Sequence, residues 1–152
     1  MTLGKIAAAL KDEPRFDVVP VVILRVQVPQ SYAEAVLGAI TEVCALRYGD
    51  YDHVSFEGAA GTQRFRSTGA GRNAATIGVA RVPCTVLSMQ VPQDADLLSA
   101  VLCAVYHVHP YEEPVIDLTP ALGTRHVRGM DEDNHNRFWN GDTPDWVPPE
   151  HR

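Results

Sequence analysis

One segment of ten residues occurs twice in this chain, and the repeat limits the possible folds more than any other feature. Residues 21–30 (VVILRVQVPQ) align without a gap on residues 84–93 (CTVLSMQVPQ). Both copies are rich in apolar and β-branched residues and contain proline near the end, which predicts two strands. Each copy precedes a helical pattern with a Val-Leu pair, at 36–37 and 101–102, and then a short strand, at 53–57 and 115–118. The chain therefore contains a duplicated strand-helix-strand unit.

Two such units predict an α+β fold of the ferredoxin-like type, with a four-stranded antiparallel sheet and two helices on one face. Because side chains alternate between the faces of a strand, one alternating set should face the helices. This predicted core set is Val22, Leu24, Val26, Val28, Val54, Phe56, Leu87, Met89, Val91, Ile116 and Leu118. The opposite face should be mixed, with an ion pair between Arg25 and Asp117 on neighbouring strands. Such a face can lie in water or contact other subunits of a closed oligomer.

The chain divides into three predicted regions. Residues 1–19 form an N-terminal helix and lead-in, and residues 20–120 form the ferredoxin-like domain. Residues 121–152 form an irregular C-terminal arm, whose aromatic residues are unusual for a disordered segment. Within the domain, residues 58–83 are too long for a simple turn, and the alternating pattern of residues 62–67 between glycines predicts an extra hairpin.

Composition excludes several classes of function. The length of 152 residues suits one domain, and the net charge of −6 argues against nucleic-acid or membrane-surface binding. Three cysteines at no metal-ligand spacing suit a reducing compartment rather than a disulfide framework. Because no apolar run is long enough for a signal peptide or a membrane span, we expect a cytoplasmic protein.

The segment His109-Pro110-Tyr111-Glu112-Glu113-Pro114 lies between the second helical pattern and the last strand. Proline disfavours helix at the residue before it, so His109 and Glu113 should be extended. We therefore expect a rigid corner from helix to strand.

Two interpretations of the corner side chains stay open at the level of sequence. His109, Glu112 and Glu113 could bind a divalent cation, with His53 or a second chain as a further ligand. The alternative is that the corner is structural and that its carboxylates cap the backbone or pair with arginine. A second acidic group, Asp131, Asp133 and His135, lacks the glycine and terminal glutamate of a calcium loop and suggests a solvated loop.

The inserted segment 58–83 is the best candidate for binding an anion. It carries Arg64, Arg66, Arg72 and Arg81 among glycines and contains no acidic residue. Guanidinium groups and backbone N–H groups freed by glycine suit a phosphate or a nucleotide. No nucleotide-binding fingerprint is present, so a solvent-exposed hairpin is the competing interpretation.

The same residues carry a resemblance to a known family. The strand that ends at Val28-Pro29, the run Tyr51 to Phe56, the glycine-rich insert and the string 109–114 resemble the domain inserted in Nif-three-like proteins, the GTP cyclohydrolase type 2 homologues. That inserted domain is similar in fold to the CutA and PII proteins, which are ferredoxin-like trimers. The resemblance covers roughly residues 20–120. The family's di-metal site lies in a flanking α/β domain, and nothing in residues 1–19 or 121–152 can supply it.

The resemblance implies a stand-alone CutA/PII-like module that forms trimers and has a sensing, regulatory or metal-tolerance role. We therefore expect a non-catalytic homo-oligomer that binds a small anionic ligand or a divalent metal ion, without nucleic-acid or membrane partners. The expected ligand-binding residues are His109, Tyr111, Glu112, Glu113, Arg64, Arg66 and Arg72, and the expected metal ligands are His53, His109, Glu112 and Glu113. Two alternatives remain: a metal-dependent hydrolase-type enzyme with an interface site, and a protein-interaction adaptor that uses the aromatic arm.

Overall fold

The computed structural model describes residues 1–130 and 132–151. Two compact units make up the chain: one contains residues Met1–Val18 and Thr124–Arg152, and the other contains residues Val19–Gly123. The division into residues 1–19, 20–120 and 121–152 stays a prediction. The interpretation of the Asp131 loop involves a residue that lies outside the described ones.

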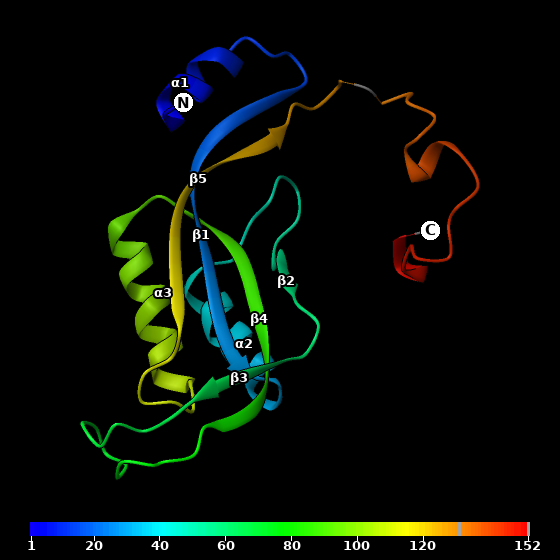
Figure 1. Cartoon of the computed structure of the whole chain (residues 1–152). Coiled ribbons are helices and arrows are strands. Elements are labelled where there is room, and N and C mark those ends of the chain that lie inside the picture. Colours follow the sequence, from blue (N-terminus) through cyan, green and yellow to red (C-terminus); the bar gives the residue numbers. More distant parts are fainter. Residues whose placement is uncertain (131, 152) are drawn as a thin grey trace. The chain divides into compact units, whose positions relative to one another are not determined.

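The larger unit consists of a β-sheet with helices packed on one of its faces (Figure 1). Its strands are β2 (Ser55–Glu57), β3 (Gly61–Phe65), β4 (Ala80–Pro92) and most of β1 (Phe16–Pro29) and β5 (Ile116–His126), whose outer ends belong to the smaller unit. Its helices are η1 (Gln30–Tyr32), α2 (Ala33–Val43) and α3 (Ala95–Val108). The strand order is β2-β4-β1-β5, and β3 also pairs with β4. The predicted ferredoxin-like α+β fold is confirmed, with five strands instead of four because the insert supplies β3.

The two copies of the repeat are β1 and β4, and they pair with each other. Their antiparallel register runs from Val21 opposite Pro92 to Pro29 opposite Cys84. Leu24 and Leu87, which occupy the same position in the two copies, are fully buried in one core with residues of α2 and α3. Burial of each leucine side chain stabilises the fold by about 1.5–3 kcal/mol. The prediction that both copies turn the same face to the helices is therefore confirmed.

Two of the predicted core assignments are wrong in β2. Phe56 pairs with Ser88, and Ser55 pairs with Met89, so Phe56 shares the face that the helices leave uncovered. Its side chain is 71% exposed. A strand register displaced by one residue turns each side chain to the other face. Val54, which precedes β2, is exposed as well.

The loop before β2 explains this register. Leu46 and His53 both have left-handed backbone conformations, with φ of 48° and 56°. The amide of His53 donates to the Ala45 carbonyl at 2.8 Å, and that of Val54 donates to the Leu46 carbonyl at 3.1 Å. These bonds close the loop and determine which residue enters β2 first.

On β5, Ile116 packs against the core as predicted, but Leu118 does not. Leu118 is 45% exposed, and β5 is the last strand of the sheet order. An edge strand has a neighbour on one side only, which leaves part of its surface to solvent.

The smaller unit contains α1 (Leu3–Leu10), η2 (Phe138–Asn140) and η3 (Pro149–His151). Thr2 caps α1, accepting a hydrogen bond from the Lys5 amide at 3.4 Å. In the arm, the Phe138 ring packs edge-on against Trp139 and Trp146, with ring centroids 5.0 and 5.9 Å apart. Among the described residues, no helix has the length and apolar character needed to span a membrane.

Candidate functional site

The predicted corner is present between α3 and β5. Asp94 caps the start of α3 by accepting a hydrogen bond from the Leu97 amide at 2.8 Å. The helix ends at Val108, and His109 is extended with ψ of 134°. The following Pro110 disfavours a helical conformation at His109, as predicted from the sequence.

The imidazole of His109 is buried and bonded at both nitrogens. Its Nε2 lies 2.9 Å from the Gln27 carbonyl oxygen, and its Nδ1 accepts the Tyr111 amide at 3.1 Å. A nitrogen that accepts an N–H carries no proton, so the hydrogen of this neutral ring is on Nε2. The side chain is only 7% exposed. Neither nitrogen is available to a metal ion while these bonds persist.

The Tyr111 ring lies between the ring of Phe65 on β3 and that of His109. Its ring centroid is 5.8 Å from that of Phe65 and 5.2 Å from that of His109. Its hydroxyl lies 3.8 Å from the Cys84 Sγ. Burial raises the pKa of Tyr111 to about 12 from 10.0, with further contributions from the hydrogen bond and the electrostatic interaction with Cys84. The phenol therefore stays protonated at neutral pH and can donate its hydrogen to sulfur.

Two glutamines continue this chain of contacts. The Cys84 thiol donates to the Gln63 Oε1 at 3.5 Å, and the Gln63 Nε2 donates to the Gln27 Oε1 at 3.1 Å. We call Gln27, Gln63, Cys84, His109 and Tyr111 the corner cluster. The cluster joins three strands to the corner and satisfies its own polar groups, which is typical of a structural network.

Sequence reasoning missed Gln63 and Cys84 as members of this cluster. Gln63 and Phe65 alternate along β3, and Gln63 lies opposite Val82 in the β3–β4 register. The alternation in residues 62–67 could have indicated that both side chains share a face. The pairing partner of β3 was not evident from the sequence, so their neighbours could not be named.

Glu112 contacts the insert. Its Oε2 accepts a hydrogen bond from the Arg72 amide at 3.4 Å. A Cβ at Gly71 would lie 3.2 Å from the same oxygen, so the absence of a side chain there permits the approach. The corner thus binds the backbone of the insert through a carboxylate, and the structural interpretation of Glu112 has a concrete partner.

The predicted metal ligands are not gathered within one chain. The described residues contain no group of three or more His, Cys, Asp and Glu side chains that could hold a metal ion. His53 Nδ1 lies 3.1 Å from Asp52 Oδ1, and Glu113 is exposed. A metal site at His53, His109, Glu112 and Glu113 therefore stays a prediction that needs ligands from a second chain.

The arginines of the insert are exposed, as the anion hypothesis requires. Arg64 and Arg66 lie at the end of β3, and Arg72 lies in the loop beyond it. The predicted ion pair of Arg25 and Asp117 is absent among the described residues, so that prediction is wrong for a single chain. Both side chains are exposed, and an exposed pair gains too little energy to order two flexible side chains.

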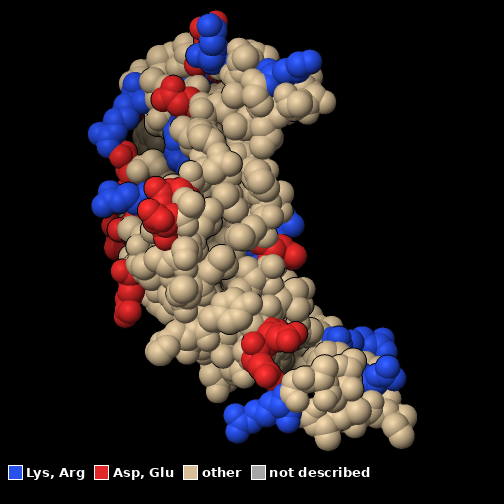
Figure 2. All heavy atoms as spheres, turned by 90° about the vertical axis from the view of Figure 1, so that its left-hand side faces the viewer, with Lys and Arg blue, Asp and Glu red and all other residues tan. Residues whose placement is uncertain are grey.

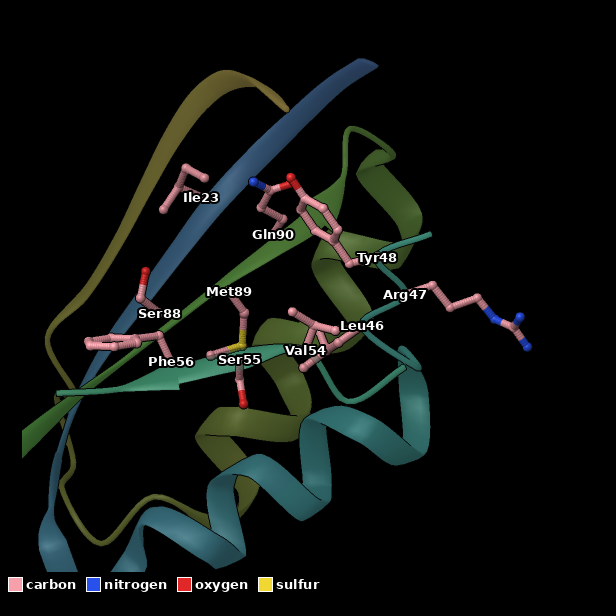
Figure 3. A pocket seen from close by; sticks show the side chains of 10 residues that line it. All are labelled: Ile23, Leu46, Arg47, Tyr48, Val54, Ser55, Phe56, Ser88, Met89 and Gln90. Carbon is pink, nitrogen blue, oxygen red and sulfur yellow. The ribbon is translucent and has the colours of Figure 1, made fainter. Parts of the chain in front are cut away.

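We call the sheet surface opposite α2 and α3 the open face. It carries Ile23, Arg25, Gln27, Phe56, Val86, Ser88 and Gln90. A pocket of about 380 Å³ lies there beside β2 and is lined mainly by apolar groups of Ile23, Leu46, Tyr48, Val54, Phe56 and Met89. In Figure 3 the Tyr48 ring lies next to Gln90, whereas Arg47 points away from the other side chains.

The fold and the site together define a ferredoxin-like domain. One face of its sheet is not covered by helices, and its polar corner is hydrogen-bonded to the insert through Glu112. No family model matches the chain. Curated relatives from Mycobacterium bovis and Mycobacterium tuberculosis, each called GTP cyclohydrolase 1 type 2 homolog, are 35% identical over 94 residues. The match covers 61% of this chain and 24% of each relative, so the chain spans about a quarter of their length.

Solved structures agree with this relationship. A Bacillus cereus protein related to NIF3 has 26% identity and a TM-score of 0.56, over 80% of this chain and 34% of its own. CutA1 from Oryza sativa has 18% identity and a TM-score of 0.50, over 70% of this chain and 84% of its own, and shows the fold alone. The predicted resemblance to the CutA/PII-like part of the Nif-three-like family is therefore confirmed.

Proposed function

We propose that this chain is a non-catalytic regulatory module that associates with copies of itself through the open face. The observation that carries the proposal is Phe56, a large aromatic side chain that is 71% exposed at the edge of an apolar pocket. Val86 is exposed on the same face. Contiguous exposed apolar groups with polar neighbours are typical of protein interaction sites.

A closed ring of three copies is the assembly that the family resemblance implies. The open face provides the apolar centre of such a contact, and Arg25 and Asp117 provide charges for ion pairs between copies. The His109 nitrogens and the Tyr111 hydroxyl have partners within the fold, which argues against their use as a catalytic acid or base.

Light scattering and native mass spectrometry of the full chain test this proposal. We expect a trimer for the unchanged chain and a monomer for Phe56→Glu, because a charge would be buried without a partner. Tyr106→Glu is the matched control, since Tyr106 is an exposed aromatic residue on α3 and should leave the trimer intact. A monomeric unchanged chain, or a trimer of Phe56→Glu, would contradict the proposal.

Ligand binding at the corner and insert is the second part of the proposed function. The ligand-binding set comprises His109, Tyr111, Glu112, Glu113, Arg64, Arg66 and Arg72. It is supported by the contact between Glu112 and the insert backbone at Arg72. An anionic ligand would bind to the arginines, whereas a divalent cation would bind to Glu112 and Glu113.

Metal analysis of the untagged full chain distinguishes these ligands. Tight stoichiometric metal that is lost in Glu112→Ala would support the cation and, with it, the hydrolase-type alternative. If the trimer is purified without metal, this result would contradict both the cation ligand and the hydrolase-type alternative. The adaptor alternative is favoured by the exposed Trp139 and Trp146 of the arm, and loss of a partner after Trp146→Ala would support it.

A further inference from the structure

Two arginines lie directly opposite each other where the insert joins the sheet. In the antiparallel register of β3 and β4, Arg64 pairs with Arg81. Directly opposite residues have Cβ atoms about 4.5–5.5 Å apart, so both guanidinium groups leave the same face side by side. Both side chains are exposed, and neither has a hydrogen-bond or ion-pair partner among the described residues.

This arrangement is electrostatically unfavourable without an anion. Like charges directly opposite each other in a sheet destabilise it, and the insert offers no acid to separate them. Figure 2 shows basic side chains around the uncharged lobe at the lower end of the view, with one acidic patch beside them. The pair is therefore a local concentration of positive charge on a protein whose net charge is −6.

We propose that Arg64 and Arg81 bind a phosphate group, either as inorganic phosphate or as a phosphate monoester. Two guanidinium forks can each donate paired hydrogen bonds to one tetrahedral oxyanion, and this geometry makes arginine the preferred phosphate ligand. Arg66, two residues after Arg64, adds charge at the edge of the site. The proposal rests on the ligand-binding part of the proposed function and names its ligand class.

The site differs from the one expected from sequence in a specific way. The amide of Arg72 already donates to Glu112, whose carboxylate would repel an anion at that position. Arg81 takes the place of Arg72 in the site because strand pairing, and not closeness in sequence, puts it beside Arg64.

Binding of an anion at Arg64 and Arg81 would also affect the corner cluster through β3. Side chains alternate along a strand, so Gln63 and Phe65, the neighbours of Arg64, point to the opposite face of β3. Gln63 bonds to Gln27, and Phe65 packs on Tyr111. An anion that orders Arg64 would therefore also order β3 against the corner.

Titration of the full chain with inorganic phosphate, and separately with phenyl phosphate, tests the proposal at constant ionic strength. Chemical shifts of the arginine Nε–H groups and of the β3 amides are the measurement. We expect saturable shifts at Arg64 and Arg81, and a loss of about tenfold in affinity for Arg64→Gln or Arg81→Gln, as is typical for a hydrogen bond to a charged group. Tighter binding of phenyl phosphate would identify a monoester as the ligand class.

Arg47→Gln is the matched control, because Arg47 is also an exposed arginine but lies outside the sheet and, in Figure 3, points away from the other side chains. Shifts that never saturate with either compound, or an equal loss of affinity in the control, would overturn the proposal. Repeating the titration on Phe56→Glu separates the inferences: saturable binding there supports the phosphate site whatever the oligomeric state. Absence of binding in both forms overturns the site and leaves self-association unaffected.

Discussion

The Nε2–H of His109 donates to the Gln27 carbonyl over 2.9 Å, although 82 positions separate the two residues in the sequence. The amide of the same Gln27 donates to the Val115 carbonyl at 3.0 Å. Gln27 is thus held at both backbone groups by the segment that runs from the end of α3 to the start of β5. The corner is thus bound to the inner strand β1 by the His109 side chain as well as by the backbone of Val115.

Replacing His109 by alanine should therefore destabilise the larger unit strongly. The change removes two hydrogen bonds of a buried ring and leaves the carbonyl of the half-buried Gln27 without this donor, which costs about 2–4 kcal/mol of the free energy of unfolding. Urea denaturation followed by circular dichroism measures this loss. His107→Ala, at an exposed position of the last turn of α3, is the control and should cost less than about 0.5 kcal/mol. Equal losses in the two variants would contradict a structural role for the His109 ring.

Tyr111 predicts a loss of stability at high pH. Its pKa is about 12 in the folded chain and 10.0 when it is solvated, so the folded state binds the phenolic proton more tightly. The stabilisation is fully present below pH 10 and is lost as the pH rises toward 12. The ring is partly open to solvent, so we expect a loss of about 1 kcal/mol rather than the full linkage value.

Tyr111→Phe isolates this contribution. Phenylalanine keeps the ring contacts with Phe65 and His109 but has no proton to lose. Unfolding free energies measured at pH values below and above 10 should therefore fall less steeply in the variant than in the unchanged chain. Parallel pH dependences of the two proteins would show that the phenol is not held in its protonated form by the fold.

Glu112 predicts a local effect on the insert without a global effect. Glu112→Ala removes the acceptor of the Arg72 amide, so this amide should exchange with deuterium several-fold faster. The free energy of unfolding should change by less than about 0.5 kcal/mol, because the carboxylate is exposed. Glu113→Ala is the matched control, and faster exchange at Arg72 in that variant would argue against the specific contact.

Much of the fold was predictable because the same alternation of core residues occurs in both copies of the repeat. Leu24 and Leu87 occupy equivalent positions, and any arrangement that buries one of them in a symmetric pair of units buries the other. The end of α3 at Val108 was equally predictable, since Pro110 restricts the residue before it. These predictions depend on local sequence and on alternation alone.

The remaining features depend on contacts that no local pattern encodes. The register of β2 is set by left-handed backbone at Leu46 and His53. Leucine gives no signal for that conformation, and histidine is enriched in it but still adopts it in only a minority of cases. The contact of Cys84 with Tyr111 and the juxtaposition of Arg64 with Arg81 both follow from the pairing of β3 with β4. Such long-range pairing is decided by the whole sheet.

The backbone at His53 offers a direct test of that explanation. At a φ of 56° a side chain brings Cβ too close to the backbone, whereas glycine adopts the conformation without this cost. Both His53→Gly and His53→Ala remove the exposed ring and its contact with Asp52, so their difference reports the backbone alone. We expect the glycine variant to be more stable than the alanine variant by about 1 kcal/mol in thermal or urea unfolding. An alanine variant that is the more stable of the two would mean that the loop is not held in the left-handed conformation and that another feature sets the register of β2.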